Sequence, residues 1–371
     1  MKHAKINLIL MATAFICFIF APSVKSIFKP EYAQENFEQR RLEAFPEIPD
    51  SWSDIKSYPE AFESYYKDHF GFRPTWVSQY RNLKNSVHDP VVDKVIFGTE
   101  SGWLFFNDKK GNDVIGDYRN INQFSEHSLN QFINNIKLKQ AWLAKQNIEY
   151  LFIIAPSKHY VYPEYLPSKY QPIAKINLKQ QLADELKKHP DINYIDLTQT
   201  LIDGKKERQM YLKNDTHWTD YATNLVQFKI ATTIENIFPK KIKPNTKPWG
   251  DFNSTINHTG DLSIMNGTTT QFKETRTLPA FKQCAETPLQ EKKKYNDTFD
   301  TNCDGHIQAL VFRDSFFSNL QPFVSEYLGL SRFVWEPMTF KAAEKHINDT
   351  HPDIVIEEWV DRFLPKLRPP K

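Results

Sequence analysis

The chain has 371 residues, with 47 basic and 45 acidic side chains and a formal net charge of +2. This balance gives no indication of a nucleic-acid partner or of an acidic membrane surface. The length is sufficient for one large domain or for two. Aromatic residues make up 14% of the sequence, a content that suits stacking on sugars and equally suits ordinary packing.

The N-terminus predicts export. Basic residues precede an apolar run of 16 residues, at positions 6–21. A secretory signal has an apolar core of about 7–15 residues, whereas a spanning helix needs about 20. We therefore expect residues 1–26 to be either a signal peptide, cleaved near Ser26, or an uncleaved signal-anchor. In both cases the body of the protein lies outside the cytoplasm.

The segment 27–90 is expected to be an N-terminal arm with helices. Residues 27–50 are polar and contain Pro46 and Pro49, as expected of a linker. Helical periodicity follows at 54–67 and 74–87, with a break at Gly71. The runs 92–97 and 103–106 then predict a hairpin.

From residue 91 to about 365, apolar runs alternate with helical patterns. Short continuous apolar runs of this kind are typical of buried parallel strands. The alternation predicts a three-layer α/β/α sandwich with a mainly parallel sheet. The expected strands are 150–154, 194–197, 307–312, 332–335 and 353–356, and the expected helices are 125–147, 176–188, 220–238 and 319–328.

A segment at about 240–305 interrupts this alternation. It is rich in Thr, Asn, Lys and Pro, and predicts a β-rich or loop-rich insertion that overhangs the site. Cys284 and Cys303 lie in this segment. In an exported protein, an isolated pair of cysteines predicts a disulfide. A zinc site, for which His306 is one nearby ligand, is the alternative. Cys17, in the apolar run, is interpreted as a small hydrophobic residue.

Two short motifs are candidates for catalysis. Asp215 and His217 lie two positions apart, and Ser315 follows the apolar run 307–312. In extended backbone, residues two apart share a face, so the Asp215 carboxylate can contact Nδ1 of His217 and leave Nε2 for a serine. Such a base activates a serine hydroxyl for acyl transfer. The alternatives are a capped loop at Asp215 and a helix N-cap at Ser315.

Together these landmarks resemble a known family. Asp215-Thr216-His217-Trp218 is similar to its acid and base motif, and Arg313-Asp314-Ser315-Phe316 to its nucleophile motif. Further matching blocks are residues 35–46, 62–73, 98–106, 155–158, 162–167 and 260–262. The family resembled is the alginate O-acetyltransferase family with an SGNH-hydrolase-like domain, the periplasmic proteins that acetylate bacterial exopolysaccharides. The likeness covers about residues 30–365.

The resemblance implies that Ser315 is the nucleophile, His217 the base and Asp215 its orienting acid. It also implies a role in substrate binding or in support of the site for Arg313, Trp218 and Tyr162. Ser157 and Lys158 are candidates for the same role because they follow the expected strand 150–154, and ligands of open α/β sheets bind outside the carboxyl ends of strands. Arg313 stands where many SGNH proteins have glycine, so the oxyanion-binding geometry is left open, because arginine lacks the backbone freedom of glycine. At Ser157 and Lys158, a turn cap and a solvated lysine are the alternative interpretations.

The expected function is serine-dependent O-acetylation of an exported polysaccharide in the periplasm, without a cofactor or a metal ion. The family implies a membrane-bound O-acyltransferase as acetyl donor and a polysaccharide export complex as partners. An acetyl esterase with the same chemistry is one alternative, because the two activities differ only in which acceptor reaches the acyl-enzyme. A non-catalytic glycan-binding subunit of the export complex is the other.

Overall fold

The computed structural model describes residues 2–28, 43–73, 75–76, 79–80, 83, 94–109, 111–242, 252–268, 273–279 and 298–367. The chain divides into two compact units. One unit comprises Met1–Val92 with Ser263–Gln271, and the other comprises Asp93–Leu262 with Phe272–Lys371. The larger unit contains both candidate catalytic motifs.

A six-stranded sheet forms the centre of the larger unit, with the strand order β4-β3-β10-β8-β9-β7. Five of its strands run parallel, and only the edge strand β7 pairs antiparallel, with β9. The strands are β3 (Glu149–Ala155), β4 (Tyr194–Asp196), β7 (Phe299–Asn302), β8 (Ala309–Phe312), β9 (Leu330–Val334) and β10 (Ile354–Val360). The mainly parallel sheet predicted from the apolar runs is therefore present.

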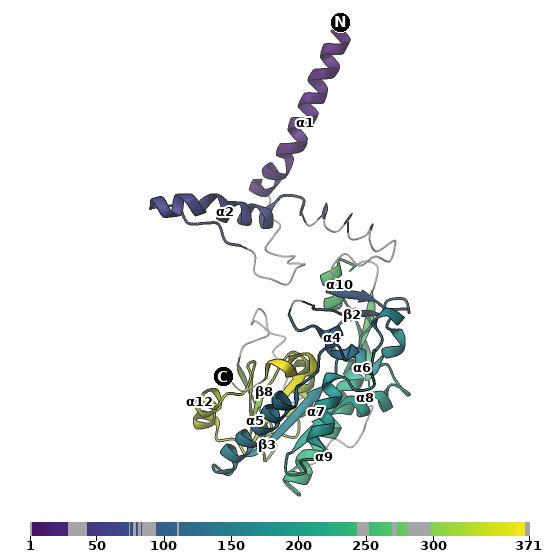
Figure 1. Ribbon diagram of the computed structural model, residues 1–371, viewed down its shortest axis with the longest axis vertical. Coiled ribbons are helices and arrows are strands. Elements are labelled where there is room, and N and C mark those ends of the chain that lie inside the picture. Colours follow the sequence, from purple (N-terminus) through teal and green to yellow (C-terminus); the bar gives the residue numbers. More distant parts are fainter. Residues whose placement is uncertain are drawn as a thin grey trace. The chain divides into compact units, whose positions relative to one another are not determined.

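Helices cover both faces of this sheet (Figure 1). Consecutive residues of a strand point to opposite faces, and β3 has apolar side chains on both. Leu151 and Ile153 pack with α8, α9 and α11, whereas Tyr150 and Phe152 pack with α5, α7 and α12. The two apolar faces explain the continuous apolar runs in the sequence.

Among the described helices of the larger unit, α4, α6, α8 and α12 were not predicted from the sequence. Their bounds are α4 (Val114–Arg119), α5 (Glu126–Ala144), α6 (Lys158–Val161), α7 (Leu178–Leu186), α8 (Thr198–Gly204), α9 (Asp220–Ile237), α11 (Phe316–Ser325) and α12 (Phe340–Thr350). Three 3₁₀ segments complete the set, η2 (Pro163–Tyr165), η3 (Ser168–Tyr170) and η4 (Asp361–Lys366).

Two hairpins lie outside the central sheet. The first pairs β1 (Val95–Phe97) with β2 (Leu104–Phe106), as the sequence predicts. The second lies in the expected insertion and pairs β5 (Phe252–His258) with β6 (Glu274–Pro279). The short helix α10 (Asp261–Asn266) starts just after β5. The insertion thus has β structure in its described part, and its last strand, β7, joins the central sheet.

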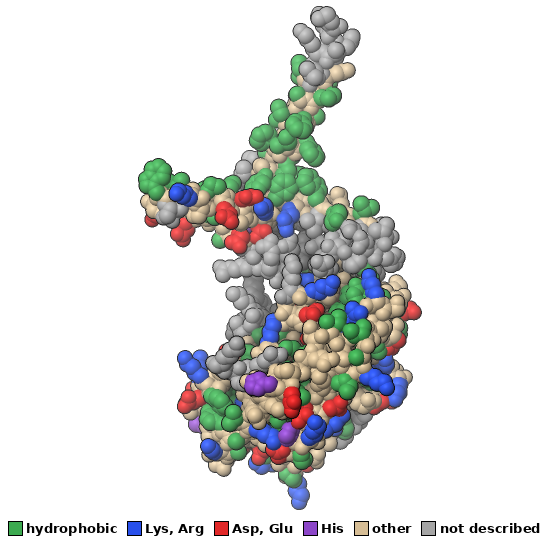
Figure 2. All heavy atoms as spheres, in the orientation of Figure 1, with side chains coloured by type: hydrophobic (Ala, Val, Ile, Leu, Met, Phe, Trp, Pro, Cys, Tyr) green, Lys and Arg blue, Asp and Glu red, His purple; other side chains and the backbone are tan. Residues whose placement is uncertain are grey.

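The smaller unit contains the helices α1 (Lys2–Phe28) and α2 (Trp52–His69). Hydrophobic side chains run along α1, as Figure 2 shows, and many of them are exposed. None of the helices in the described part of the chain is long and apolar enough to cross a membrane, and this includes α1, which covers the predicted signal or anchor segment. Most of the predicted linker 27–50 and helix 74–87 lies outside the described residues.

A buried polar cluster stabilises the sheet face opposite α9. The carboxylate of Glu357 accepts hydrogen bonds from Lys139 Nζ at 2.7 Å, Tyr150 OH at 2.6 Å and Trp359 Nε1 at 3.2 Å. Lys139 and Glu357 are both buried, so the loss of one partner leaves an uncompensated charge in the core.

Replacing Lys139 with methionine is therefore expected to lower the free energy of unfolding by about 3–5 kcal/mol. Denaturant unfolding followed by circular dichroism measures this loss. Lys187→Met is the matched control, because Lys187 forms an exposed pair with Asp184 that contributes about 1 kcal/mol or less. Equal effects of the two substitutions would contradict the role given to the buried cluster.

Candidate active site

Ser315 lies where β8 gives way to α11. Strand β8 ends at Phe312, and the Arg313 N–H donates to the carbonyl oxygen of Val334 on the neighbouring strand at 3.0 Å. Ser315 then occupies the N-cap position of α11 with helical backbone angles, and its side chain makes no capping bond. The Ser315 side chain therefore does not cap α11, which was the alternative interpretation. Its hydroxyl lies near the carboxyl end of β8 without a capping bond.

The carboxylate of Asp314 fixes this turn. It accepts the Phe316 N–H at 2.8 Å and the Val360 N–H, at the end of β10, at 2.8 Å. Burial raises the pKa of the Asp314 carboxyl, and the charge of Arg362 opposes that rise. Arg313 is tied to β9 and Asp314 to β10, so the two residues that precede Ser315 hold its backbone at the sheet edge.

The side chain of Arg313 serves packing. Its guanidinium donates to Ser318 Oγ at 2.9 Å and lies 4.8 Å from the ring centre of Trp335. Burial lowers the pKa of Arg313 to about 10. The residue that replaces the usual glycine therefore braces the start of α11, and its described contacts are all structural.

The acid and base motif lies on a short loop between α8 and α9. Tyr211 and Trp218 form an isolated antiparallel bridge, and the Leu212 N–H donates to the His217 carbonyl at 3.2 Å. The Lys213 carbonyl accepts the Leu104 N–H at 2.9 Å, which attaches the loop to β2. Asp215 and His217 are thus at the tip of a closed loop.

The contact predicted between these two side chains is present. His217 Nδ1 is 2.7 Å from Asp215 Oδ1, and the same oxygen accepts the His217 backbone N–H at 2.9 Å. Since an ionised carboxylate only accepts hydrogen bonds, the proton lies on Nδ1. In the described part of the chain, Nε2 of His217 is buried and has no hydrogen-bond partner. This is the arrangement required of a general base.

The charges of the pair stabilise each other. Burial opposes the charged form of both groups, but their mutual hydrogen bond and attraction outweigh it. The pKa of Asp215 is held well below its ordinary value, and the pKa of His217 is raised above 6.5. Asp215 is therefore ionised at neutral pH, and it favours protonation of His217 when a proton is transferred.

Two residues of the insertion contact the motif from the other side. His258 Nε2 lies 2.8 Å from Asp215 Oδ2, and Asp261 accepts the Thr216 N–H at 2.7 Å. Burial first, and then the charge of Asp215, raise the pKa of Asp261 to about 6. The Gly260-Asp261-Leu262 block in the sequence resemblance indicated Asp261, whereas no sequence signal indicated His258.

The residue that follows Ser315 contacts His217, but no hydrogen bond joins Ser315 and His217 in the described structure. The ring of Phe316, which directly follows Ser315, lies 5.1 Å from the His217 ring between centres. The predicted Ser315–His217 hydrogen bond is not formed in the described structure, because His217 Nε2 has no partner. Such bonds are commonly long until a substrate is bound.

Asp215, His217 and Asp261 are close enough to be considered as metal ligands, with ligand atoms within 4.8 Å of one another. The Asp215–His217 separation of 2.7 Å is a hydrogen-bond distance. Two ligands on a tetrahedral zinc ion with bonds of about 2.0–2.1 Å would be about 3.3 Å apart. Both carboxylates also accept N–H groups of the motif, so the cluster fits a hydrogen-bond network better than a metal centre.

Ser157 and Lys158 lie after β3 and are buried. Lys158 Nζ donates to the carbonyl oxygens of Leu104 at 2.8 Å and Lys213 at 2.9 Å, and burial lowers its pKa to about 8. Lys158 thus secures the loop of the acid and base motif to β2. The Ser157 N–H donates to the Asp361 carboxylate, and its hydroxyl has no partner among the described residues. The alternative interpretation of Lys158 as a solvated lysine is wrong, because its side chain is buried.

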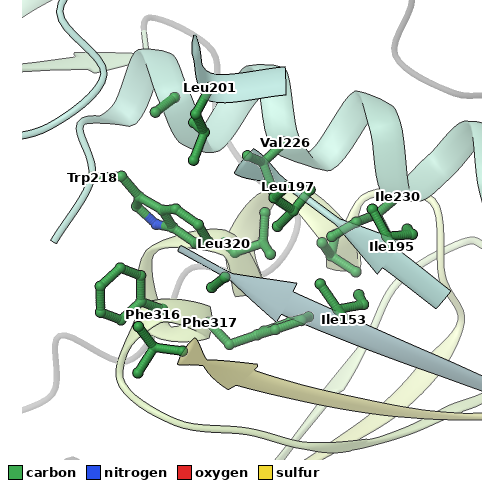
Figure 3. Close-up of a cluster of buried hydrophobic side chains, with 14 of the residues drawn as sticks. Ile153, Ile195, Leu197, Leu201, Trp218, Val226, Ile230, Phe316, Phe317 and Leu320 are labelled. Carbon is green, nitrogen blue, oxygen red and sulfur yellow. The ribbon is translucent and has the colours of Figure 1, made fainter. Parts of the chain in front are cut away.

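Trp218 and Tyr162 support the site from the core. The Trp218 indole packs edge-on against Phe316, with ring centres 5.1 Å apart (Figure 3). The Tyr162 hydroxyl accepts the Met210 N–H at 2.8 Å. Both side chains are buried and present no open surface on which a sugar could stack.

Arg362 lies just after β10, in η4. Its guanidinium lies 5.2 Å from the ring centre of Phe106 and 5.3 Å from that of Phe316. It forms no close ion pair within the described residues, but its charge opposes the rise in pKa of the buried Asp314 and Asp361 carboxyls. Its positive charge opposes protonation of His217.

Of the two cysteines predicted to pair, Cys303 is buried just after β7, and Cys284 lies outside the described residues. Cys17 is free and exposed.

Comparisons with known proteins place the chain in a family. A family model described as "SGNH hydrolase-like domain, acetyltransferase AlgX" matches residues 95–329. The chain is 28% identical over 180 residues to "Probable alginate O-acetylase AlgJ" of Azotobacter vinelandii, covering 48% of this chain and 43% of that relative. It is 24% identical over 212 residues to the protein of the same name from Pseudomonas fluorescens, covering 56% and 50%. The chain spans about half the length of these curated relatives.

Among solved structures, the chain is similar to Bacillus cereus PatB1, with a TM-score of 0.52 and 18% identity. The match covers 73% of this chain and 97% of that one. At this identity the likeness concerns the fold alone. The α/β fold of SGNH-hydrolase type that the sequence analysis expects is confirmed by the family model and by the parallel sheet.

Proposed function

Because the chain belongs to the family described as SGNH hydrolase-like domain, acetyltransferase AlgX, we propose that it is a serine-dependent O-acetyltransferase that modifies an exported bacterial polysaccharide. The observation that carries the proposal is the Asp215–His217 pair. Its 2.7 Å contact sets the tautomer and leaves Nε2 without a partner beside the ring that follows Ser315.

The proposed reaction has two half-reactions. In the first, Ser315 Oγ attacks the carbonyl carbon of a donor acetyl group while His217 Nε2 takes the hydroxyl proton. The bond between the acetyl group and the donor oxygen breaks, and His217 returns the proton to that oxygen. An acetyl ester of Ser315 remains, and Asp215 stabilises the transient imidazolium.

In the second half-reaction, a sugar hydroxyl loses its proton to His217 Nε2 and attacks the acetyl-serine. The ester bond to Ser315 breaks, and the proton passes from His217 to the serine oxygen. The acetyl group ends on the polysaccharide, and the enzyme is regenerated. No cofactor takes part in either half-reaction. Lys158 acts by holding the loop that carries His217.

Two other functions use the same site. An acetyl esterase would let water attack the acetyl-serine, and a glycan-binding subunit would not use Ser315 for chemistry. The Asp215–His217 pair favours an enzyme over the binding subunit, because a binding site has no need of a buried, oriented base. The names of the curated relatives favour transfer over hydrolysis.

The partition of the acetyl group between sugar and water tests this choice. The purified chain is incubated with an activated acetyl ester in the presence of candidate exopolysaccharides, and acetyl-polysaccharide and free acetate are quantified by NMR. We expect acetylated polymer to exceed free acetate when the correct acceptor is present. Free acetate alone with every acceptor would support the esterase.

The setting follows from the same proposal. We place the catalytic body in the periplasm, exported through residues 1–26. The acetyl donor is a membrane-bound O-acyltransferase, which passes the acetyl group to Ser315 next to a polysaccharide export complex. Acetyl-coenzyme A is a cytoplasmic metabolite, so a transferred acetyl group suits a periplasmic enzyme.

We also propose that Cys284 and Cys303 form a disulfide in this oxidising compartment. Closure of the loop between them is expected to stabilise the protein by about 3 kcal/mol. Thiol labelling of the denatured, unreduced protein should modify Cys17 alone. Labelling of Cys284 and Cys303 before reduction would show that the pair is reduced.

The raised pKa of His217 predicts the pH dependence of activity. His217 must be neutral to accept a proton, so kcat/KM should fall as the pH drops through a pKa that lies above 6.5. The acidic limb of a pH–rate profile with an acetyl ester measures that pKa. His127→Asn, at an exposed position of α5, should leave the limb in place. A midpoint below 6.5 would contradict the stabilising role of Asp215.

A further inference from the structure

The β5–β6 hairpin of the insertion contacts the acid and base loop at several points. Across the hairpin, His258 on β5 is the register partner of Glu274 on β6. His258 binds Asp215 at 2.8 Å, and Glu274 accepts the N–H groups of Lys213 at 2.7 Å and Asn214 at 3.3 Å. The register pair His258–Glu274 therefore holds the acid and base loop through Asp215 on one side and through Lys213 and Asn214 on the other.

Two further contacts fix the hairpin relative to α9 and to the acid and base loop. Arg276 on β6 makes a bidentate pair with Asp220 at the start of α9, with distances of 2.6 and 2.8 Å. Asp220 is buried, so the pair is a firm anchor. At Gly260, an added Cβ would lie 2.1 Å from the Asn214 carbonyl oxygen, so the chain after β5 approaches the loop as closely as only glycine permits.

The bond from His258 can fix the orientation of the Asp215 carboxylate about its terminal torsion. The terminal torsion of an aspartate has broad preferences, so hydrogen bonds must set its plane. Among the described residues, Oδ1 of Asp215 accepts only from His217, through Nδ1 and the backbone N–H. Oδ2 accepts from His258 at 2.8 Å and from the Asp261 N–H at a longer 3.2 Å. His258 therefore provides the shorter bond to the second oxygen.

We propose that His258 is a positioning residue of the catalytic pair, and that the inserted hairpin is part of the catalytic apparatus. His258 holds the Asp215 carboxylate in the plane in which Oδ1 meets His217 Nδ1. This inference rests on the proposed function, and it assigns the insertion a role that differs from covering the site. It also explains why the hairpin is anchored at Asp220, on the helix that leads away from His217.

The test compares His258→Leu with His258→Gln. Leucine removes the donor, whereas the glutamine amide can present an N–H near the position of Nε2. With an acetyl ester, His258→Leu is expected to lower kcat about 10- to 100-fold, the value of one hydrogen bond to a charged group, with KM nearly unchanged. His258→Gln should restore most of the rate. Thr255→Ala, at an exposed position of the same strand, is the matched control.

A second measurement does not depend on turnover. In the Ser315→Ala background, proton NMR should show a downfield resonance from the His217 Nδ1 proton bound to Asp215. We expect that resonance to be broadened or lost in His258→Leu and retained in His258→Gln. If Ser315 proves not to be a nucleophile, this result still tests the position of Asp215. An unchanged resonance in His258→Leu, or equal rates for the Leu and Gln variants, would overturn the proposal.

Discussion

Replacing Ser315 with alanine is expected to abolish acetyl transfer while leaving the fold intact. The hydroxyl is half-buried at the start of α11 and makes no capping bond, so its loss removes no structural contact in the described structure. The Asp314 bonds that hold the turn use backbone N–H groups and remain. Residual turnover should be a very small fraction of the rate of the unmodified chain, because the step that forms the acetyl-serine no longer exists.

His217→Ala should cause a loss of similar size, and the double variant should be no worse than either single one. The serine and its base act as a unit, so their effects on kcat do not add. Rates with an acetyl ester, together with thermal unfolding of all three variants, test this expectation. Multiplicative losses in the double variant would show that the two residues act in separate steps. If cells that carry Ser315→Ala keep the phenotype of the unmodified protein, the glycan-binding subunit would be favoured instead.

Asp215→Asn is expected to lower kcat/KM by roughly 10⁴-fold, by analogy with serine proteases. The carboxylate of Asp215 accepts from two imidazoles, His217 on one oxygen and His258 on the other. An asparagine has only one acceptor oxygen, so its NH₂ group must face one of the two rings. When it faces His217, Nδ1 must accept a hydrogen bond, and the proton moves to Nε2, where it blocks the base.

The matched control for this variant is Asp261→Asn. Asp261 bonds Thr216 and lies 3.8 Å from His217 Nδ1, but it does not set the His217 tautomer. Its loss should cost about tenfold or less, the value of one hydrogen bond. Measurement of kcat/KM for Asp215→Asn and Asp261→Asn shows which of the two carboxylates sets the His217 tautomer. Comparable losses would indicate that Asp261 shares the role assigned to Asp215.

The sequence predicts the central strands well because they are buried on both faces. The runs that become β3 and β8 are almost entirely apolar, and β10 begins with the apolar run Ile354–Ile356 before its two buried glutamates. The insertion was harder to predict, because β5 and β6 pair with each other away from the core and carry polar residues at most positions. A polar hairpin gives no hydrophobic alternation, so only a β-rich or loop-rich segment could be expected there.

Helix α12 shows a different limit. Phe340, Ala343 and Ile347 recur at helical spacing, and Thr339 caps the helix through the Ala342 N–H, so a local signal was present but was not used. The helix packs on the second face of the sheet, against β8.

The candidate site was predictable only where its geometry is local. Residues two apart in extended backbone share a face, so the Asp215–His217 contact followed from spacing. The contact between Asp215 and His258 spans 43 positions and depends on how the insertion folds back, for which the sequence has no marker. Lys158 was indicated as a site residue because it follows β3, but its burial beneath the loop needed the fold.

Acid quenching of the enzyme during turnover, followed by peptide mapping by mass spectrometry, tests the central claim most directly. With an activated acetyl ester and no acceptor, we predict an acetyl group on the peptide that contains Ser315. The group should disappear when the acceptor polysaccharide is added, and it should not form in the Ser315→Ala or His217→Ala chain. Transfer that proceeds without an acetylated Ser315 peptide, or an acetyl group that is found on another residue, would contradict the proposed mechanism.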